Sequence, residues 1–278
     1  MKFEEQSVEL IPQPTTLEEA YKLAELAGRV SYMSHDSTTE DSYKRFIENM
    51  KKNEHLSVLE FTPIYVTVPA YMLEEALFKT FFEEVDASYY RLNIEDTYAY
   101  ITTNLRVIIE NYLERMLEYW VPPTEHHTKR VMFKFVTNIG VSRECNRHRK
   151  NSILEQSSRY CNYSKDKFGN ELTFIYPESG YDKKVLELCL KGGYIHESGF
   201  STEILLVEAL KVSESAYMSL IKEGVKPQDA RHVLPLLTKT VLYHSAFEDD
   251  WQHFIKLRSA KNAHPDIQFI ANEVKKYI

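Results

Sequence analysis

Positively charged side chains are concentrated in one short stretch near the middle of the chain, RECNRHRKNSILEQSSRYCNYSKDK (143–167). Five of its first eight residues can carry positive charge, namely Arg143, Arg147, His148, Arg149 and Lys150. Arginine suits phosphate, because its planar guanidinium donates two parallel hydrogen bonds to one anion. Serine hydroxyls and tyrosine rings follow over 152–163, where they could complete an anion site and stack on a ring. The stretch therefore predicts a site for a phosphorylated ligand.

The segment before this stretch is predicted to support it. RVMFKFVTNIGV (130–141) is rich in β-branched and aromatic residues, which predicts a strand that leads directly into the cations. Binding residues are often held at the ends of such rigid elements. If residues 147–157 are helical, helical spacing also brings Arg149 near Ser152. The alternative is a solvated basic loop that binds nothing.

Strands and helices are partly segregated along the rest of the chain. Residues 61–70 and 236–247 also have strand-like composition. Helical patterns or helix-boundary residues occur at 15–32, 40–53, 74–85, 104–120, 204–224, 227–234, 249–260 and 264–278. Thr16 is predicted to cap the first helix, because Glu19 follows three residues later. A sheet combined with helices in this way predicts an α+β fold.

The overall composition limits the class of ligand. The chain has 278 residues, a formal net charge of −7 and 43% hydrophobic residues. Domains that bind long nucleic acids are usually basic, so a local basic patch on an acidic chain favours a small anionic ligand. The three cysteines, Cys145, Cys161 and Cys189, have no disulfide-like spacing. With an acidic start and no apolar run of about 18 residues, this predicts a cytoplasmic protein without a membrane span.

Five segments of the chain, taken together, resemble the conserved blocks of one enzyme family. RHRKNSILEQSSRY (147–160) resembles the signature of flavin-dependent thymidylate synthases, in which Arg-His-Arg is followed after seven residues by Ser, then Arg and Tyr. Four further segments resemble blocks of that family in the same order, namely LAGRVSY (26–32), HLSVLEF (55–61), GVKPQDARHVLP (224–235) and HFIKLR (253–258). The resemblance implies a mainly antiparallel sheet flanked by helices, in a single domain over 1–278 with an insertion at about 71–130.

The chain departs from the family pattern at particular positions. Glu144 stands where the family commonly has Gln, Leu154 where it has Asn, and Ser158 where it has Gly. His253 stands where some members have an Asn that helps to hold the flavin. These departures concern the details of flavin and nucleotide contacts and leave the cationic residues unchanged.

The resemblance implies a specific reaction. The family forms dTMP from dUMP, with 5,10-methylenetetrahydrofolate as carbon donor, NADPH as reductant and FAD as hydride carrier. Cofactors supply the difficult chemistry in such enzymes, and the protein supplies orientation and charge. None of the cysteines lies in the Pro-Cys-Gln context of the unrelated, cysteine-dependent synthases. A homotetramer with active sites shared between subunits is also implied.

Roles for individual residues follow from the same resemblance. Arg258 is implied to be catalytic, stabilising negative charge on the activated pyrimidine. The residues implied to contact FAD are Ser57, Arg147, His148, Arg149, Glu155 and His253. Those implied to surround dUMP are Glu144, Arg147, Glu155, Gln156, Ser157, Ser158, Arg159 and Arg231. On spacing alone, Arg231 and Arg258 would be surface ion pairs instead.

Three alternatives remain open. A nucleic-acid-binding module would place the cations on phosphates and stack bases on Tyr160 and Tyr163. A metal hydrolase would use some of the ten histidines, although no His-Glu-x-x-His motif occurs and the adjacent His126 and His127 are expected to face different directions. A relative with weakened flavin binding would keep the fold and lose the reaction.

Overall fold

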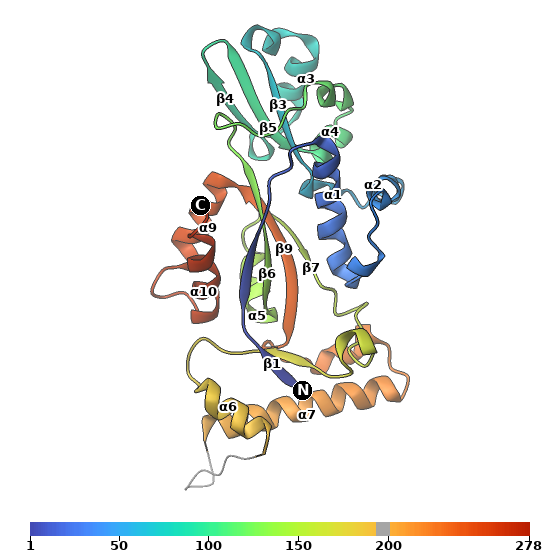
Figure 1. The fold of residues 1–278 in the computed structure, drawn as a ribbon, viewed down its shortest axis with the longest axis vertical. Helices are drawn as coiled ribbons and strands as arrows, with labels where there is room; N and C mark the ends of the chain where they lie inside the picture. Colours follow the sequence, from blue (N-terminus) through green and yellow to red (C-terminus); the bar gives the residue numbers. More distant parts are fainter. Residues whose placement is uncertain (193–200) are drawn as a thin grey trace.

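An antiparallel sheet forms the centre of the computed structural model, which describes residues 1–192 and 201–278 (Figure 1). In spatial order its strands are β2 (Ser7–Ile11), β6 (Arg130–Asn138), β9 (Lys239–Phe247) and β7 (Ser152–Glu155). β6 and β9 pair over their full length, from Arg130 opposite Phe247 to Asn138 opposite Lys239. β7 lies at the edge of the sheet. The strands predicted around 130–141 and 236–247, and the α+β class, are confirmed.

Helices cover both faces of this sheet (Figure 1). Alternation along β6 sends Phe133 and Phe135 to one face, where they are buried against Trp251 and Phe254. The helices on that side are α5 (Ile139–Cys145), α9 (Glu248–Arg258) and α10 (Pro265–Val274). On the opposite face Met132 joins a second core, which includes residues of α1 (Leu17–Gly28) and α2 (Ser42–Lys52). The helices predicted at 15–32, 40–53, 249–260 and 264–278 are confirmed.

A smaller antiparallel sheet lies at one end of the long axis (Figure 1). Its strands, in spatial order, are β3 (Pro63–Pro69), β5 (Tyr98–Asn104) and β4 (Arg91–Glu95). Beside it lie α3 (Ala76–Glu84) and α4 (Leu105–Glu110). The segment 71–130 is therefore ordered around its own sheet, which it shares with β3. The predicted strand at 61–70 and helix at 74–85 are confirmed.

The other end of the molecule is built from a parallel strand pair and helices (Figure 1). These elements are β1 (Lys2–Glu4), β8 (Thr173–Ile175), α6 (Lys183–Leu190), α7 (Thr202–Lys222) and α8 (Pro227–Ala230). As predicted, α7 ends just before Gly224, which has a φ of 87°, a conformation that glycine adopts without steric cost. Pro227 occupies the first turn of α8, also as predicted.

Three local predictions were wrong. Residues 147–157 are not helical, because turns lead from Asn146 into the extended strand β7. β6 does not lead directly into the cations, since α5 lies between them. The helix predicted over 104–120 breaks after Glu110, where Tyr112 has a φ of 57°, and a 3-10 helix (Glu114–Tyr119) follows.

Candidate functional site

The basic turn at residues 146–151 is anchored at both ends. At its start, Asn146 ends α5, and its backbone N and its Nδ2 each donate to the Ser142 carbonyl at 3.0 Å. At its end, Asn151 Nδ2 lies 2.8 Å from Nε2 of the buried His244 on β9. The turn is therefore held between helix α5 and strand β9 of the sheet, and not directly by β6 as the sequence predicted.

The cations of this turn face solvent without carboxylate partners. Arg147, Arg149 and Lys150 are exposed, and in the part of the chain that the structure describes none forms an ion pair. The same holds for Arg159 and Arg231. Cations with unused hydrogen-bond donors, clustered on a fixed turn, are suited to bind phosphate.

Arg258 is held on the inner side of the turn by two sequence-predicted residues. Its Nη1 lies 2.7 Å from Glu144 Oε2, and its Nη2 donates to the Glu144 carbonyl at 2.9 Å. Its Nε donates to His148 Nε2 at 3.0 Å. Arg258 is thus in an ion pair, but with a carboxylate of the predicted site rather than with a neighbour on its own helix. Phe254 packs under His148, with ring centroids 4.8 Å apart, and His253 lies on the same side at 6.0 Å.

His148 is neutral in this arrangement. Its side chain is buried, and burial, the Arg258 charge and His253 together lower its pKa to about 4. Because Nε2 accepts the hydrogen bond from Arg258, a proton at that atom would break the contact. Burial likewise lowers the pKa of His244.

Acid is expected to destabilise the fold through His148. In the unfolded chain its pKa returns to about 6.5, so the unfolded state binds more protons between pH 6.5 and 4, and stability falls as pH falls. Between pH 7.5 and 5 the loss should be about 2 kcal/mol. Urea unfolding at the two pH values measures it, and His148→Gln should flatten the pH dependence. An equal decline in both proteins would show that His148 is not responsible.

The side chains of Ile153, Leu154 and Glu155 on β7 alternate between the two faces of the sheet. Ile153 packs with the α9 side of the sheet and Leu154 with the α1 side. Glu155 points to the α5 side, where Thr240 donates to its Oε1 at 2.8 Å. Burial raises the pKa of Glu155, while the hydroxyls of Ser142 and Thr240 partly oppose this rise. A carboxyl in such a place could exchange a proton with a bound ligand.

Residues 157–160 form a separate group beside the 3-10 helix Arg29–Tyr32. Ser157 N donates to the Ser31 carbonyl at 3.1 Å, and the rings of Tyr160 and Tyr32 stack at 4.5 Å. Arg231 reaches this group from the segment after α8, with its Nη1 3.4 Å from Ser158 Oγ. The sequence-predicted dUMP residues Ser157, Ser158, Arg159 and Arg231 are thereby brought together.

Two cavities share the basic turn as a wall. One has a volume of about 500 Å³ and is lined by Arg147–Asn151, Asp250, His253 and Leu257. The other, about 360 Å³, joins Arg149 to the predicted flavin contact Ser57. Ser57, His148, Arg149 and His253 are therefore brought to one region of the surface.

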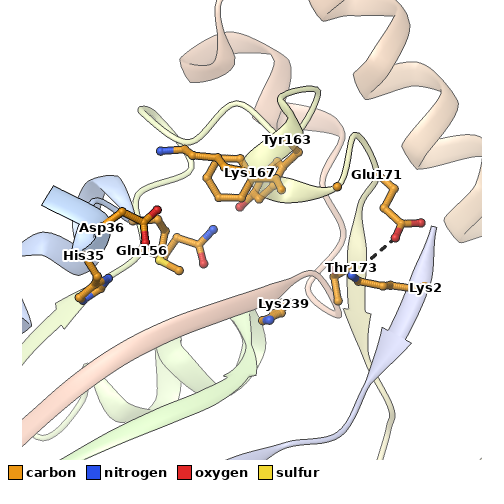
Figure 2. Close-up of a pocket in the computed structure, with 12 residues that line it drawn as sticks. Lys2, His35, Asp36, Gln156, Tyr163, Lys167, Glu171, Thr173 and Lys239 are labelled. Carbon is orange, nitrogen blue, oxygen red and sulfur yellow. Dashed lines mark ion pairs between the residues drawn. The ribbon is translucent and has the colours of Figure 1, made fainter.

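Gln156 is placed elsewhere. Figure 2 shows its side chain in a cavity of about 350 Å³, which is also lined by Lys2, Lys167 and Lys239. Two of those lysines are already engaged, Lys2 with Glu171 at 3.6 Å and Lys239 with Glu4 at 2.6 Å. The cavity therefore has no clear excess of positive charge and is separate from the cavities along the basic turn.

A polar network beneath the turn was not predicted from the sequence. The buried Arg130 bonds the hydroxyl of Ser152, which in turn bonds Glu60. Glu60 also pairs with Arg106 at 2.7 Å. Glu60 belongs to the HLSVLEF segment (55–61), whose resemblance to a block of the family could have pointed to it. Nothing in the sequence connects Arg106 or Arg130 to this place.

The cysteines and the two adjacent histidines are structural. Cys145, Cys161 and Cys189 are free and buried, and burial raises the pKa of each thiol, which keeps it protonated. His126 pairs with Glu95 at 2.6 Å, whereas His127 is buried against Val66. The two rings face different partners, as predicted.

The chain belongs to a known family. The sequence model of the thymidylate synthase complementing protein family matches residues 83–278, which include the basic turn, Arg231 and Arg258. Among curated relatives, the flavin-dependent thymidylate synthase of Pyrococcus furiosus is 30% identical over 167 residues, 59% of either chain. A flavin-dependent thymidylate synthase of Thermus thermophilus is 31% identical over 150 residues, 53% of this chain and 52% of the relative. The chain thus spans about half the length of the curated relatives it matches.

A solved structure shows a more distant likeness. The chain aligns with a UMP/dUMP methylase from Streptomyces cacaoi, bound with 5-Br dUMP, at a TM-score of 0.44 and 18% identity, covering 99% of this chain and 91% of that one. Within the described residues, no helix combines the length and apolarity needed to cross a membrane.

Proposed function

We propose that this chain is a flavin-dependent thymidylate synthase that converts dUMP to dTMP. The carbon donor is 5,10-methylenetetrahydrofolate and the reductant is NADPH. FAD, when bound, supplies the hydride that reduces the transferred carbon. Membership of the family supports this proposal, and one structural observation carries it: exposed, unpaired arginines and a lysine line two cavities on either side of a fixed turn.

The residues fit a flavin dinucleotide and a nucleotide. Arg147 and Arg149 are free to bind the diphosphate, and Ser57 lines the same cavity as Arg149. The cavity volumes are within the range of about 300–1,000 Å³ typical of small-molecule sites. Arg159 and Arg231 are free to bind the dUMP phosphate, and Ser157 and Ser158 supply hydroxyl donors beside them.

Arg258 is proposed to act on the pyrimidine. Its guanidinium is oriented by Glu144 and by neutral His148, so little reorganisation is needed when negative charge develops on the ring. Glu144 is proposed to contact dUMP at the same place, and Glu155 to hold a proton near the bound nucleotide and flavin.

Sharing of active sites in a homotetramer is part of the proposal. The cavity at His253 includes none of Ser157, Arg159 and Arg231. One chain therefore presents its flavin-binding turn and its phosphate-binding arginines as separate groups. Subunits that exchange these groups would complete each site.

The visible spectrum of the purified protein tests the proposed function. We expect the absorption bands of oxidised FAD, bleaching when NADPH is added without oxygen, and dTMP formation when dUMP and 5,10-methylenetetrahydrofolate follow. A protein that stays colourless with added FAD would refute the synthase reaction. In that case the departures at Leu154 and His253 would be the first residues to revert, to Asn in each case.

A further inference from the structure

Two cavities meet at the side chains of Ser57 and Arg106. The first, about 510 Å³, has a largely apolar and aromatic wall at Phe46, Met50 and Tyr160, and its other lining residues include Arg29, Glu54, His55 and Glu110. The second is the cavity of about 360 Å³ at the basic turn, lined by Arg149 and Lys150. Ser57 and Arg106 line both, so these two side chains stand at the boundary between an apolar compartment and a cationic one.

Arg106 is supplied by the segment 71–130, which we propose to be an insertion within a single domain. It lies in the first turn of α4, a helix capped by the Asn104 side chain, which accepts from Val107 N at 3.2 Å. Asn104 and Tyr89, from the same segment, also line the cationic cavity. The segment therefore contributes part of the cavity wall as well as its own small sheet.

Two ion pairs fix the Arg106 guanidinium. Its Nε donates to Glu110 Oε1 at 2.9 Å and its Nη1 donates to Glu60 Oε1 at 2.7 Å. Its Nη2 has no hydrogen-bond acceptor among the residues that the structure describes. The side chain is thus pre-oriented and keeps one nitrogen for a ligand, which lowers the entropic cost of binding.

The charge balance of the boundary favours an anion. Arg106 and the buried Arg130 balance the carboxylates of Glu60 and Glu110. Arg149 and Lys150 then add positive charge without carboxylate partners in the described chain. A ligand that suits both compartments carries phosphate at one place and an apolar ring at another, which is the chemistry of a dinucleotide.

We propose that Arg106 is a dinucleotide-binding residue contributed by the segment 71–130. It binds phosphate at the boundary together with Arg149, while one ring system of the dinucleotide occupies the compartment between Phe46 and Tyr160. This proposal rests on the proposed function in that the dinucleotide is FAD. It gives the segment 71–130 a direct role in holding the cofactor.

Titration of flavin-free protein with FAD, FMN and riboflavin, followed by flavin fluorescence, tests the proposal. In Arg106→Ala the Kd for FAD should rise by about 10- to 100-fold, because a charge-assisted hydrogen bond to phosphate is lost. Riboflavin has no phosphate, so its Kd should stay within about twofold. The matched control is Arg115→Ala, which removes an exposed arginine of the same segment outside both cavities and should leave FAD affinity unchanged.

The outcomes separate this proposal from the proposed function. If wild-type protein binds none of the three flavins, the synthase function fails. If it binds FAD and Arg106→Ala binds FAD as tightly as Arg115→Ala does, the role of Arg106 is refuted. Equal weakening of FAD and riboflavin would also refute it, since that pattern marks a structural defect. Should Arg106→Ala fail to fold, Arg106→Lys is the second variant, because it keeps the charge. Its Kd for FAD is expected to rise severalfold, whereas the Kd of Arg115→Lys should stay unchanged. Equal FAD affinities in these two variants would refute the role of Arg106.

Discussion

Replacing Arg258 by alanine is expected to lower dTMP formation by about 10²- to 10³-fold while flavin remains bound, the typical cost of losing one pre-oriented donor to developing negative charge. Arg258 makes three hydrogen bonds to Glu144 and His148 and its side chain is only 14% exposed, so it is held in one orientation. The measurements are the rate of dTMP formation at saturating substrates and the flavin absorbance per chain.

Two controls separate a chemical role of Arg258 from a structural one. Lys256→Ala removes an exposed cation of the same helix and should leave turnover unchanged. Glu144→Gln keeps a hydrogen-bond acceptor for Arg258 and restores the residue common in the family, so turnover should be retained. If Arg258→Ala turns over like Lys256→Ala, Arg258 is not part of the mechanism. If it loses flavin and turnover together, its role is structural.

The elements with strong local signals were predictable from the sequence. The Thr16 cap of α1 accepts from Glu19 N at 3.1 Å, as the spacing indicates, and Pro227 begins α8. Helix α5 was missed because it is only seven residues long and begins at Ile139, directly after the last residue of β6. Its start depends on the Asn138 cap, in a sequence that continues the strand pattern.

The contacts that assemble the site are mostly long-range, and spacing does not reveal them. Arg258 meets Glu144 across 114 residues, and Arg106 meets Glu60 across 46 residues. The hairpin of β4 and β5 was missed although its turn residue Asp96 has a φ of 53° and β4 alternates between polar and apolar residues, because β4 is only five residues long and β5 does not alternate. The family resemblance, rather than periodicity, singled out Glu144, His148 and Arg258 together.

The double variant Arg159→Ala/Arg231→Ala is expected to lower kcat/KM for dUMP by at least about 10²-fold, mainly through KM. Both arginines are exposed and unpaired in the described chain, so their loss leaves no buried carboxylate and should not unfold the protein. Each charged hydrogen bond to phosphate contributes roughly 1.5–3 kcal/mol, and the two act on one anion, so their effects are not strictly additive. Arg45→Ala/Arg115→Ala makes the same change in net charge at exposed sites that line none of the cavities described above. Equal kcat/KM in the two double variants would contradict phosphate binding by Arg159 and Arg231.

Oligomers that mix two kinds of variant subunit test whether the active sites are shared between subunits. If active sites are shared, Arg258→Ala subunits supply intact Arg159 and Arg231, while the double-variant subunits supply intact Arg258. At a dUMP concentration well below the KM of the double variant, mixed oligomers, co-expressed with two different tags and purified through both, should then form dTMP faster than either parent, because some sites receive all three arginines. Mixed oligomers as inactive as either parent would place the three arginines of each site in one chain. Such a result would require Arg258 to leave Glu144 and approach Arg231 within that chain, since the two arginines belong to separate groups of residues here.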